Sequence, residues 1–136
     1  MGTAIFPGRL DSLEKIRDFV LRAARQAGLD ETAIYAIELS VDEACTNIIE
    51  HAYGGEDRGN IEVSCIADGR GLTIRLRDTG KPFNPLKIPI PHARVRLKHL
   101  KSRGAGLFLM RKMMDEVHFE FIPDLVNTLT MVKYKK

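Results

Sequence analysis

The chain has 136 residues, a mass of 15.3 kDa and a formal net charge of +3, so it can form one domain that buries about two-thirds of its unfolded surface. Its hydrophobic share of 44% and charged share of 29% are those of an ordinary globular protein. No apolar run approaches the roughly 20 residues of a membrane span, and the first residues lack the pattern of a secretory signal. We therefore expect a single cytoplasmic domain over residues 1–136 that has no membrane partner.

Two helices are predicted in the first part of the chain. Apolar residues follow a 3.6-residue period over about residues 12–27, and Gly28 stands where such a helix would end. A second periodic run follows the N-cap candidate Asp30 and ends near Tyr53, before two glycines.

The apolar period then changes to two, which predicts strands. Residues 61–66 and 72–77 alternate on either side of the turn Asp68-Gly69-Arg70-Gly71, as in a hairpin. Parity puts Asp78 on the apolar face of the second strand, so a carboxylate should point toward the buried side.

The segment after this hairpin is rich in proline and in basic residues. Four prolines exclude regular structure over most of residues 81–103, and a connection of this length inside a domain is usually functional or mobile. Gly104-Ala105-Gly106 then opens a third helix. Strands are expected at about 117–121 and 128–134.

The order helix, helix, strand, strand, connection, helix, strand, strand predicts an α+β fold. Because the helices and the hairpin strands are separated along the chain, we expect a two-layer α/β sandwich whose sheet has helices on one face. Cys45 and Cys65 lie in apolar segments without metal-ligand spacing, which predicts buried thiols.

Three polar residues of the second helix are spaced to share one face. Glu43 and Asn47 are four residues apart, and His51 follows one turn later. A solvated polar stripe would have the same pattern. Asparagine is a mediocre helix former, however, and its carbonyl oxygen suits Mg²⁺, which takes one or two protein oxygens and completes its shell with phosphate and water. Glu43 could then accept a proton from a hydroxyl or water near a γ-phosphate.

Asp78-Thr79-Gly80 ends the predicted strand. An inward carboxylate needs a donor, and the exocyclic amine of adenine is one, while Gly80 would let the base approach the backbone. Asp78 could equally bond nearby backbone amides.

A glycine pair precedes the third helix. Gly104 and Gly106 could be a flexible lead-in, or their amides at a helix N-terminus could bind phosphate. Lys101 and Arg103 stand beside them and favour the second interpretation.

Together these segments resemble the GHKL (histidine-kinase-like) ATPase superfamily. Glu43-Ala44-Cys45-Thr46-Asn47 resembles its N box, Asp78-Thr79-Gly80 its first glycine box and Arg103-Gly104-Ala105-Gly106-Leu107 its second. Within the superfamily, the chain is most similar to bacterial anti-sigma-factor serine/threonine-protein kinases, a likeness that includes His51-Ala52-Tyr53 and covers about residues 10–134.

The resemblance implies a Bergerat-type fold with a mixed sheet, an ATP lid over about residues 81–106, and ATP and Mg²⁺ as cofactors. It implies Asn47 as magnesium ligand, Glu43 as catalytic base and Asp78 as adenine reader. Thr128 matches a threonine on the adenine side. The remaining residues implied to bind the nucleotide are His51, Gly80, Lys101, Arg103, Gly104, Ala105, Gly106 and Leu107. Pro82 departs from the family, which commonly has a second glycine there.

Two classes of function follow from this resemblance. One is a kinase that phosphorylates an anti-sigma-factor antagonist and sequesters a sigma factor. The other is a non-catalytic module in which ATP only orders the lid and the protein sequesters its partner. Glutamate at position 43 favours the kinase, because a pure binder needs no base there. Direct nucleic-acid binding through residues 92–103 is disfavoured, since no aromatic residue is interleaved with the bases. The family also allows a homodimer.

Overall fold

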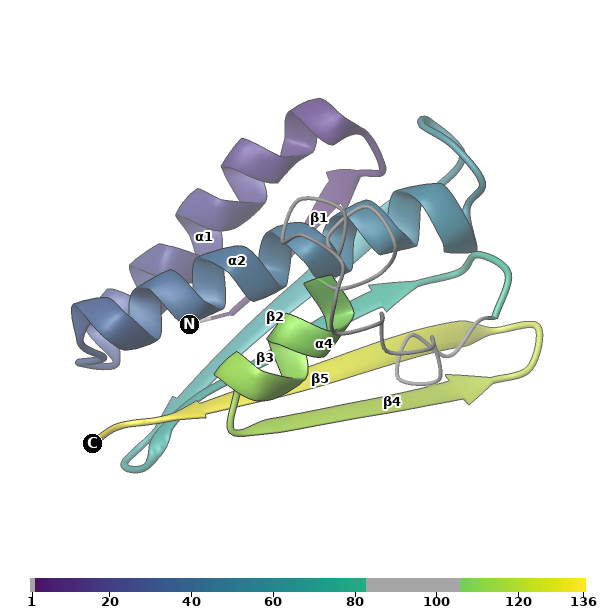
Figure 1. The fold of residues 1–136 in the computed structure, drawn as a ribbon. Coiled ribbons are helices and arrows are strands. Elements are labelled where there is room, and N and C mark those ends of the chain that lie inside the picture. The colour runs from purple at the N-terminus through teal and green to yellow at the C-terminus, as the bar shows by residue number, and fades with distance from the viewer. Residues whose placement is uncertain (1, 83–105) are drawn as a thin grey trace, which may run out of the picture.

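A computed structural model describes residues 2–82 and 106–136, apart from the side chains of residues 106–109. Five strands form one sheet in the order β1-β2-β3-β5-β4. The strands are β1 (Gly2–Pro7), β2 (Asn60–Asp68), β3 (Gly71–Asp78), β4 (Glu116–Ile122) and β5 (Val126–Tyr134). Helices α1 (Leu13–Gln26), α2 (Glu31–Asn47) and α4 (Gly106–Met113) cover one face of this sheet (Figure 1). Two layers are therefore present, as the α+β prediction required.

The sheet differs from the mixed sheet expected by resemblance, because every strand pairing is antiparallel. β1 and β2 are joined through two helices, so the chain reverses direction at each of three junctions and β2 returns antiparallel to β1. β3 and β4 do run in the same direction, but β5 lies between them and pairs with both. The parallel strands β3 and β4 are therefore not neighbours in the sheet, and no parallel pair forms among the described strands.

The first helix ends at the glycine that the sequence indicates. Gly28 has a φ of +82°, and the amides of Gly28 and Leu29 donate to the carbonyls of Arg25 (3.0 Å) and Ala24 (3.2 Å). This is the left-handed cap in which glycine avoids a steric cost. A short 3₁₀ turn, η1 (Leu10–Ser12), precedes the helix.

The second helix begins and ends with distinct local devices. Asp30 caps it, since its Oδ1 accepts a hydrogen bond from the amide of Ala33 at 2.9 Å. After Asn47 the chain continues as a π-helix, η2 (Ile48–Ala52), closed by the amide of Tyr53 on the carbonyl of Ile48 at 3.0 Å. Single π turns inside α-helices occur frequently at functional sites.

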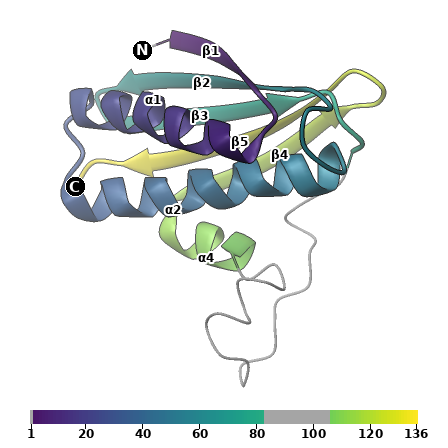
Figure 2. The ribbon, with the colours of Figure 1, turned by 90° about the horizontal axis from the view of Figure 1, so that it is seen from above.

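The core lies between the sheet and the helices, with α2 between α1 and α4 (Figure 2). The buried faces of β2 and β3 alternate as the sequence predicts, and the turn between them is held by Asp68, whose Oδ1 accepts from the amides of Arg70 and Gly71. Cys45 and Cys65 are both buried free thiols, and burial raises the pKa of Cys65 to about 11. Among the described helices, none combines the length and apolar character needed to cross a bilayer.

Candidate nucleotide site

Asn47 is the last residue of α2, and one atom of its side-chain amide makes a hydrogen bond within the helix. The side chain is buried, with 7% of its surface exposed, and its Nδ2 donates to the carbonyl of Glu43 one turn earlier at 2.8 Å. This bond fixes which end of the amide faces outward. The carbonyl oxygen Oδ1 is therefore the atom that remains to coordinate a ligand.

Asp78 ends β3 on the helix-facing side, as parity predicted, and only 5% of it is exposed. Its Oδ1 accepts two hydrogen bonds, from the amide of Gly80 at 2.9 Å and from Nδ2 of Asn127 at 2.8 Å. Burial raises the pKa of this carboxyl, while the bonds from Asn127 and Gly80 act in the opposite direction. Because both bonds end on Oδ1, Oδ2 is left as an acceptor for a further donor.

Asn127 is a site residue that the resemblance did not indicate. It is the direct cross-strand partner of Asp78, is 3% exposed, and its Nδ2 also lies 3.1 Å from the carbonyl of Gly80. The alternation of Leu129 and Met131 on the buried face carries the signal, because counting back by two places Asn127 on that face as well.

Gly80 joins the strand end to the end of the π-helix. A Cβ on Gly80 would lie 2.5 Å from the carbonyl oxygen of Ala52, and the next amide, of Lys81, donates to that same oxygen at 2.7 Å. The absence of a side chain at Gly80 is therefore needed for contact with Ala52. The sequence analysis explained this glycine by the approach of a nucleotide base to the backbone. The contact with the backbone of Ala52 already requires a glycine at this position.

Glu43 and His51 differ in their placement relative to Asn47. Glu43 is half-buried one helical turn before Asn47, as predicted. His51 is exposed and belongs to η2. The helix predicted to continue to Tyr53 is therefore π-helical over residues 48–52, the segment that carries His51.

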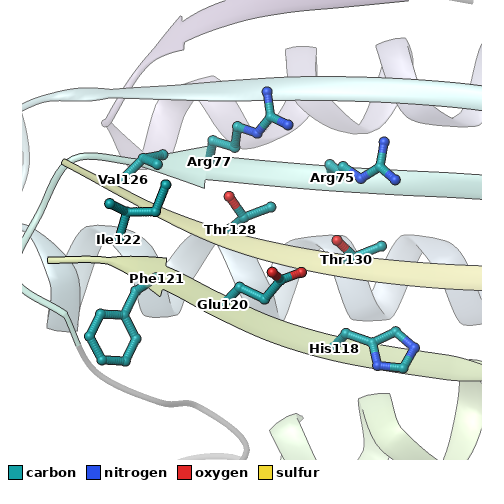
Figure 3. A pocket seen from close by; sticks show the side chains of 9 residues that line it. All are labelled: Arg75, Arg77, His118, Glu120, Phe121, Ile122, Val126, Thr128 and Thr130. Atoms are coloured by element: carbon teal, nitrogen blue, oxygen red, sulfur yellow. The ribbon is translucent and has the colours of Figure 1, made fainter.

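Thr128 does not join this site, which corrects the expectation by resemblance. Its partner across the ladder is Arg77, on the face of the sheet away from the helices. There Thr128 lines a groove of about 450 Å³ together with Arg75, Thr130 and Glu120 (Figure 3). A shift of one residue along a strand changes the face, so the inward position belongs to Asn127.

The other predicted residues either belong to the first turn of α4 or precede this helix in the sequence. Gly106 is the first residue of α4, as the prediction of a third helix required, and Leu107 follows within it. Lys101, Arg103, Gly104 and Ala105 lie outside the described residues. Within the described part of the chain, no group of three or more histidine, cysteine, aspartate or glutamate residues is arranged to hold a metal.

Comparison with known families decides the relationship of the chain. The sequence matches the Histidine kinase-like ATPase domain over residues 6–133. The chain belongs to this family. The resemblance read from the N box and the two glycine boxes is thereby confirmed.

Curated relatives of this histidine kinase-like ATPase carry the name Serine-protein kinase RsbW. The protein from Bacillus thuringiensis (strain Al Hakam) is 30% identical over 132 residues, which cover 94% of this chain and 81% of the relative. The protein from Bacillus anthracis (strain CDC 684 / NRRL 3495) is 30% identical over 137 residues with the same coverage.

A solved structure is similar in fold to this histidine kinase-like ATPase. It contains the RsbU and RsbW domains of Rv1364c from Mycobacterium tuberculosis, and the match has a TM-score of 0.66 at 16% sequence identity. The match covers all of this chain and 33% of that one. The α+β architecture predicted from the element order is thus confirmed.

The site residues of this histidine kinase-like ATPase suit a magnesium nucleotide. Mg²⁺ needs one or two protein oxygens when phosphates and water supply the others, and Asn47 offers one oriented carbonyl oxygen. The amine of adenine needs an acceptor, and Asp78 offers Oδ2 from a carboxylate that is already held through Oδ1. The donor set therefore fits this ligand.

Proposed function

We propose that this protein is an ATP-dependent protein serine/threonine kinase that acts as an anti-sigma factor. It phosphorylates a serine or threonine of an anti-sigma-factor antagonist and sequesters a sigma factor. The names of the relatives support the kinase activity. The observation that carries the proposal is the buried carboxylate of Asp78, which accepts hydrogen bonds at Oδ1 only. It lies at a strand end that is linked through Gly80 and Lys81 to the π-helix following Asn47.

Each residue has a separate role in this proposal. Asp78 accepts a hydrogen bond from the adenine amine through Oδ2, and Asn127 holds that carboxylate in place. Asn47 offers Oδ1 to Mg²⁺, which when bound neutralises negative charge on the phosphates. Lys101, Arg103, Gly104 and Ala105 belong to the proposed ATP lid, about residues 81–106, and are proposed to bind the nucleotide.

Glu43 is the proposed base. The hydroxyl oxygen of the substrate serine forms a bond to the γ-phosphorus while the bond from that phosphorus to the β–γ bridging oxygen breaks, and ADP leaves with the electron pair. Glu43 takes the hydroxyl proton. Phosphoryl transfer depends mainly on positioning and charge stabilisation, so few residues are needed for the chemistry itself.

The cellular setting completes the proposal. The domain works in the cytoplasm, and it acts on separate proteins rather than on nucleic acid. A homodimer is compatible with these roles.

Glu43→Gln tests the kinase against a module that only binds ATP. The variant should bind Mg-ATP and the antagonist like the wild type, because the amide has the same shape as the carboxyl. It should lose roughly 10²-fold or more of the transfer rate, the usual contribution of a general base. Single-turnover transfer of labelled phosphate measures this rate.

A matched control is Glu38→Gln, on the same helix, which should transfer phosphate at the wild-type rate. Wild-type protein that binds Mg-ATP tightly and transfers nothing to any serine-bearing partner would favour the sequestering module. A fully active Glu43→Gln would place the base at another residue.

A further inference from the structure

Tyr53 connects three segments that meet at the candidate nucleotide site. It directly follows η2, and its hydroxyl donates a hydrogen bond to the carbonyl of Asn60 at the start of β2. The same hydroxyl oxygen accepts a hydrogen bond from the amide of Thr79 at 3.0 Å. Thr79 is the residue after Asp78, so Tyr53 holds the strand end from which the adenine-reading carboxylate projects.

The ring of Tyr53 is seated by a glycine. A Cβ on Gly59 would lie 2.3 Å from Cε1 of Tyr53, so a larger residue at 59 would displace the ring. Gly59 is fixed in turn, because its carbonyl accepts from the amide of Gly8 at 2.8 Å. Packing of the ring on Gly59 therefore fixes the position of the tyrosine hydroxyl.

The bond to Thr79 is not needed to satisfy a buried group. Thr79 is exposed, and an exposed amide can bond to water at little cost. A bond that spans 26 residues of sequence at an exposed amide therefore does more for the position of the backbone than for its solvation.

A second link reinforces the same connection. The amide of Lys81 donates to the carbonyl of Ala52 at 2.7 Å, so consecutive residues 52 and 53 are tied to residues 81 and 79. Asp78 is attached to one side of this connection, and Asn47 precedes η2 on the other. The two bonds therefore link the strand end that carries Asp78 to the segment that follows Asn47.

We propose that Tyr53 is a positioning residue for the nucleotide: its hydroxyl holds Asp78 in register with Asn47, so that one ligand can reach both. The inference rests on the proposed function, since it assumes that Asp78 reads the adenine amine. Tyr53 itself contacts neither the base nor the phosphates in this proposal.

Tyr53→Phe tests the proposal, because it keeps the ring on Gly59 and removes only the hydroxyl. Wild type and variant are titrated with Mg-ATP and with Mg-ITP, whose base carries an oxygen where adenine carries the amine. The comparison separates an effect on recognition of the amine from a general effect on nucleotide binding. The dissociation constant for ATP should rise roughly 2- to 10-fold, the range for one lost hydrogen bond. The constant for ITP should stay unchanged.

The catalytic constants give a second readout. KM for ATP should rise while kcat stays at the wild-type value, because the transfer machinery is untouched. The matched control is Tyr35→Phe, which alters an exposed tyrosine of α2 and should leave both constants unchanged. A merely destabilising change would lower the active fraction and affect ATP and ITP equally.

Two outcomes overturn different statements. If the wild type binds no Mg-ATP, the proposed function fails and this inference fails with it. If the wild type binds Mg-ATP and prefers it to Mg-ITP, but Tyr53→Phe keeps the wild-type preference, the proposed function stands and the role of Tyr53 is refuted.

Discussion

Asp78→Asn should convert the proposed adenine reader into a group that repels adenine. In the wild type, Oδ1 accepts from the Gly80 amide at 2.9 Å and from Asn127 Nδ2 at 2.8 Å. These two donors fix the orientation of an asparagine at 78, because the flipped amide would turn its own N–H groups toward them. The amide nitrogen must therefore occupy the Oδ2 position and present a donor to the adenine amine.

The expected loss follows from the bond that disappears. A hydrogen bond to a charged group contributes about 1.5–3 kcal/mol, and about 1.36 kcal/mol corresponds to a factor of ten. Affinity for Mg-ATP should fall roughly 10- to 150-fold. Mg-ITP should lose much less or gain, because its base offers an acceptor to the new donor.

The same substitution should leave the fold as stable as the wild type or more stable at pH 7. Burial raises the pKa of Asp78 above its ordinary value, so the folded protein holds this proton more tightly than the unfolded chain does. The contribution of Asp78 to the free energy of unfolding is therefore lowest at a pH above its pKa in the folded protein, and it rises as the pH falls through that pKa. The neutral amide avoids the burial of a charge, and its advantage should shrink on acidification.

Calorimetric titration with both nucleotides, together with thermal unfolding at several pH values, provides the test. An Asp78→Asn variant that bound Mg-ATP as tightly as the wild type would refute the reasoning. So would a wild type that bound ATP and ITP equally well. Loss of binding accompanied by a lower melting temperature would indicate a structural role in place of base recognition.

Two other substitutions test the neighbours of this carboxylate. Asn47→Ala loses only a local hydrogen bond to Glu43, so the variant should fold normally and bind ATP with no increase in affinity when Mg²⁺ is added. ATP titrations with and without Mg²⁺ measure this increase. An increase equal to that of the wild type would exclude Asn47 as the magnesium ligand. Asn127→Ala removes a bond that lowers the pKa of Asp78, so ATP affinity should begin to fall at a higher pH than in the wild type. A pH series of ATP titrations measures that midpoint, with the exposed Asn60→Ala as control, and an unshifted midpoint would contradict the assigned contact.

Periodicity predicted most of the fold because most elements have one clear apolar face. The helices at 13–26 and 31–47 and the hairpin strands at 60–68 and 71–78 lie close to their predicted positions. β1 has no such signal, since it is a short edge strand with only Ala4 and Phe6 turned toward the core side. Its pairing with β2 is a long-range contact that no local pattern reports.

Sequence reasoning predicted the placement of those candidate site residues that depends on helix spacing or strand parity. Asp78 and Asn47 lie where parity and spacing put them. His51 lies in a π-helix, which the sequence did not predict because a π-helix has no sequence signature that separates it from an α-helix. Thr128 was assigned by likeness to a family motif, whereas the strand's own alternation places Asn127 toward Asp78.

The contacts that assemble the site are long-range and could not be read from the chain. Tyr53 reaches Thr79 through a bond across 26 residues, and Asn127 reaches Asp78 across 49. Each belongs to a segment with a sufficient local explanation, a helix end or a strand. Only the folded structure shows that these two residues converge on one strand end.

The buried carboxylate explains why this strand end is suited to a ligand rather than to the core. A carboxylate can accept at both oxygens, yet Asp78 accepts at Oδ1 alone while burial raises its pKa. Burial disfavours the charged form of a carboxyl group, so packing alone would favour an apolar residue at this position. In the proposed function, the adenine amine donates a hydrogen bond to Oδ2 and favours the charged form on binding. A base that presents an acceptor there offers no such bond, which would give the site its selectivity for an amino-bearing base.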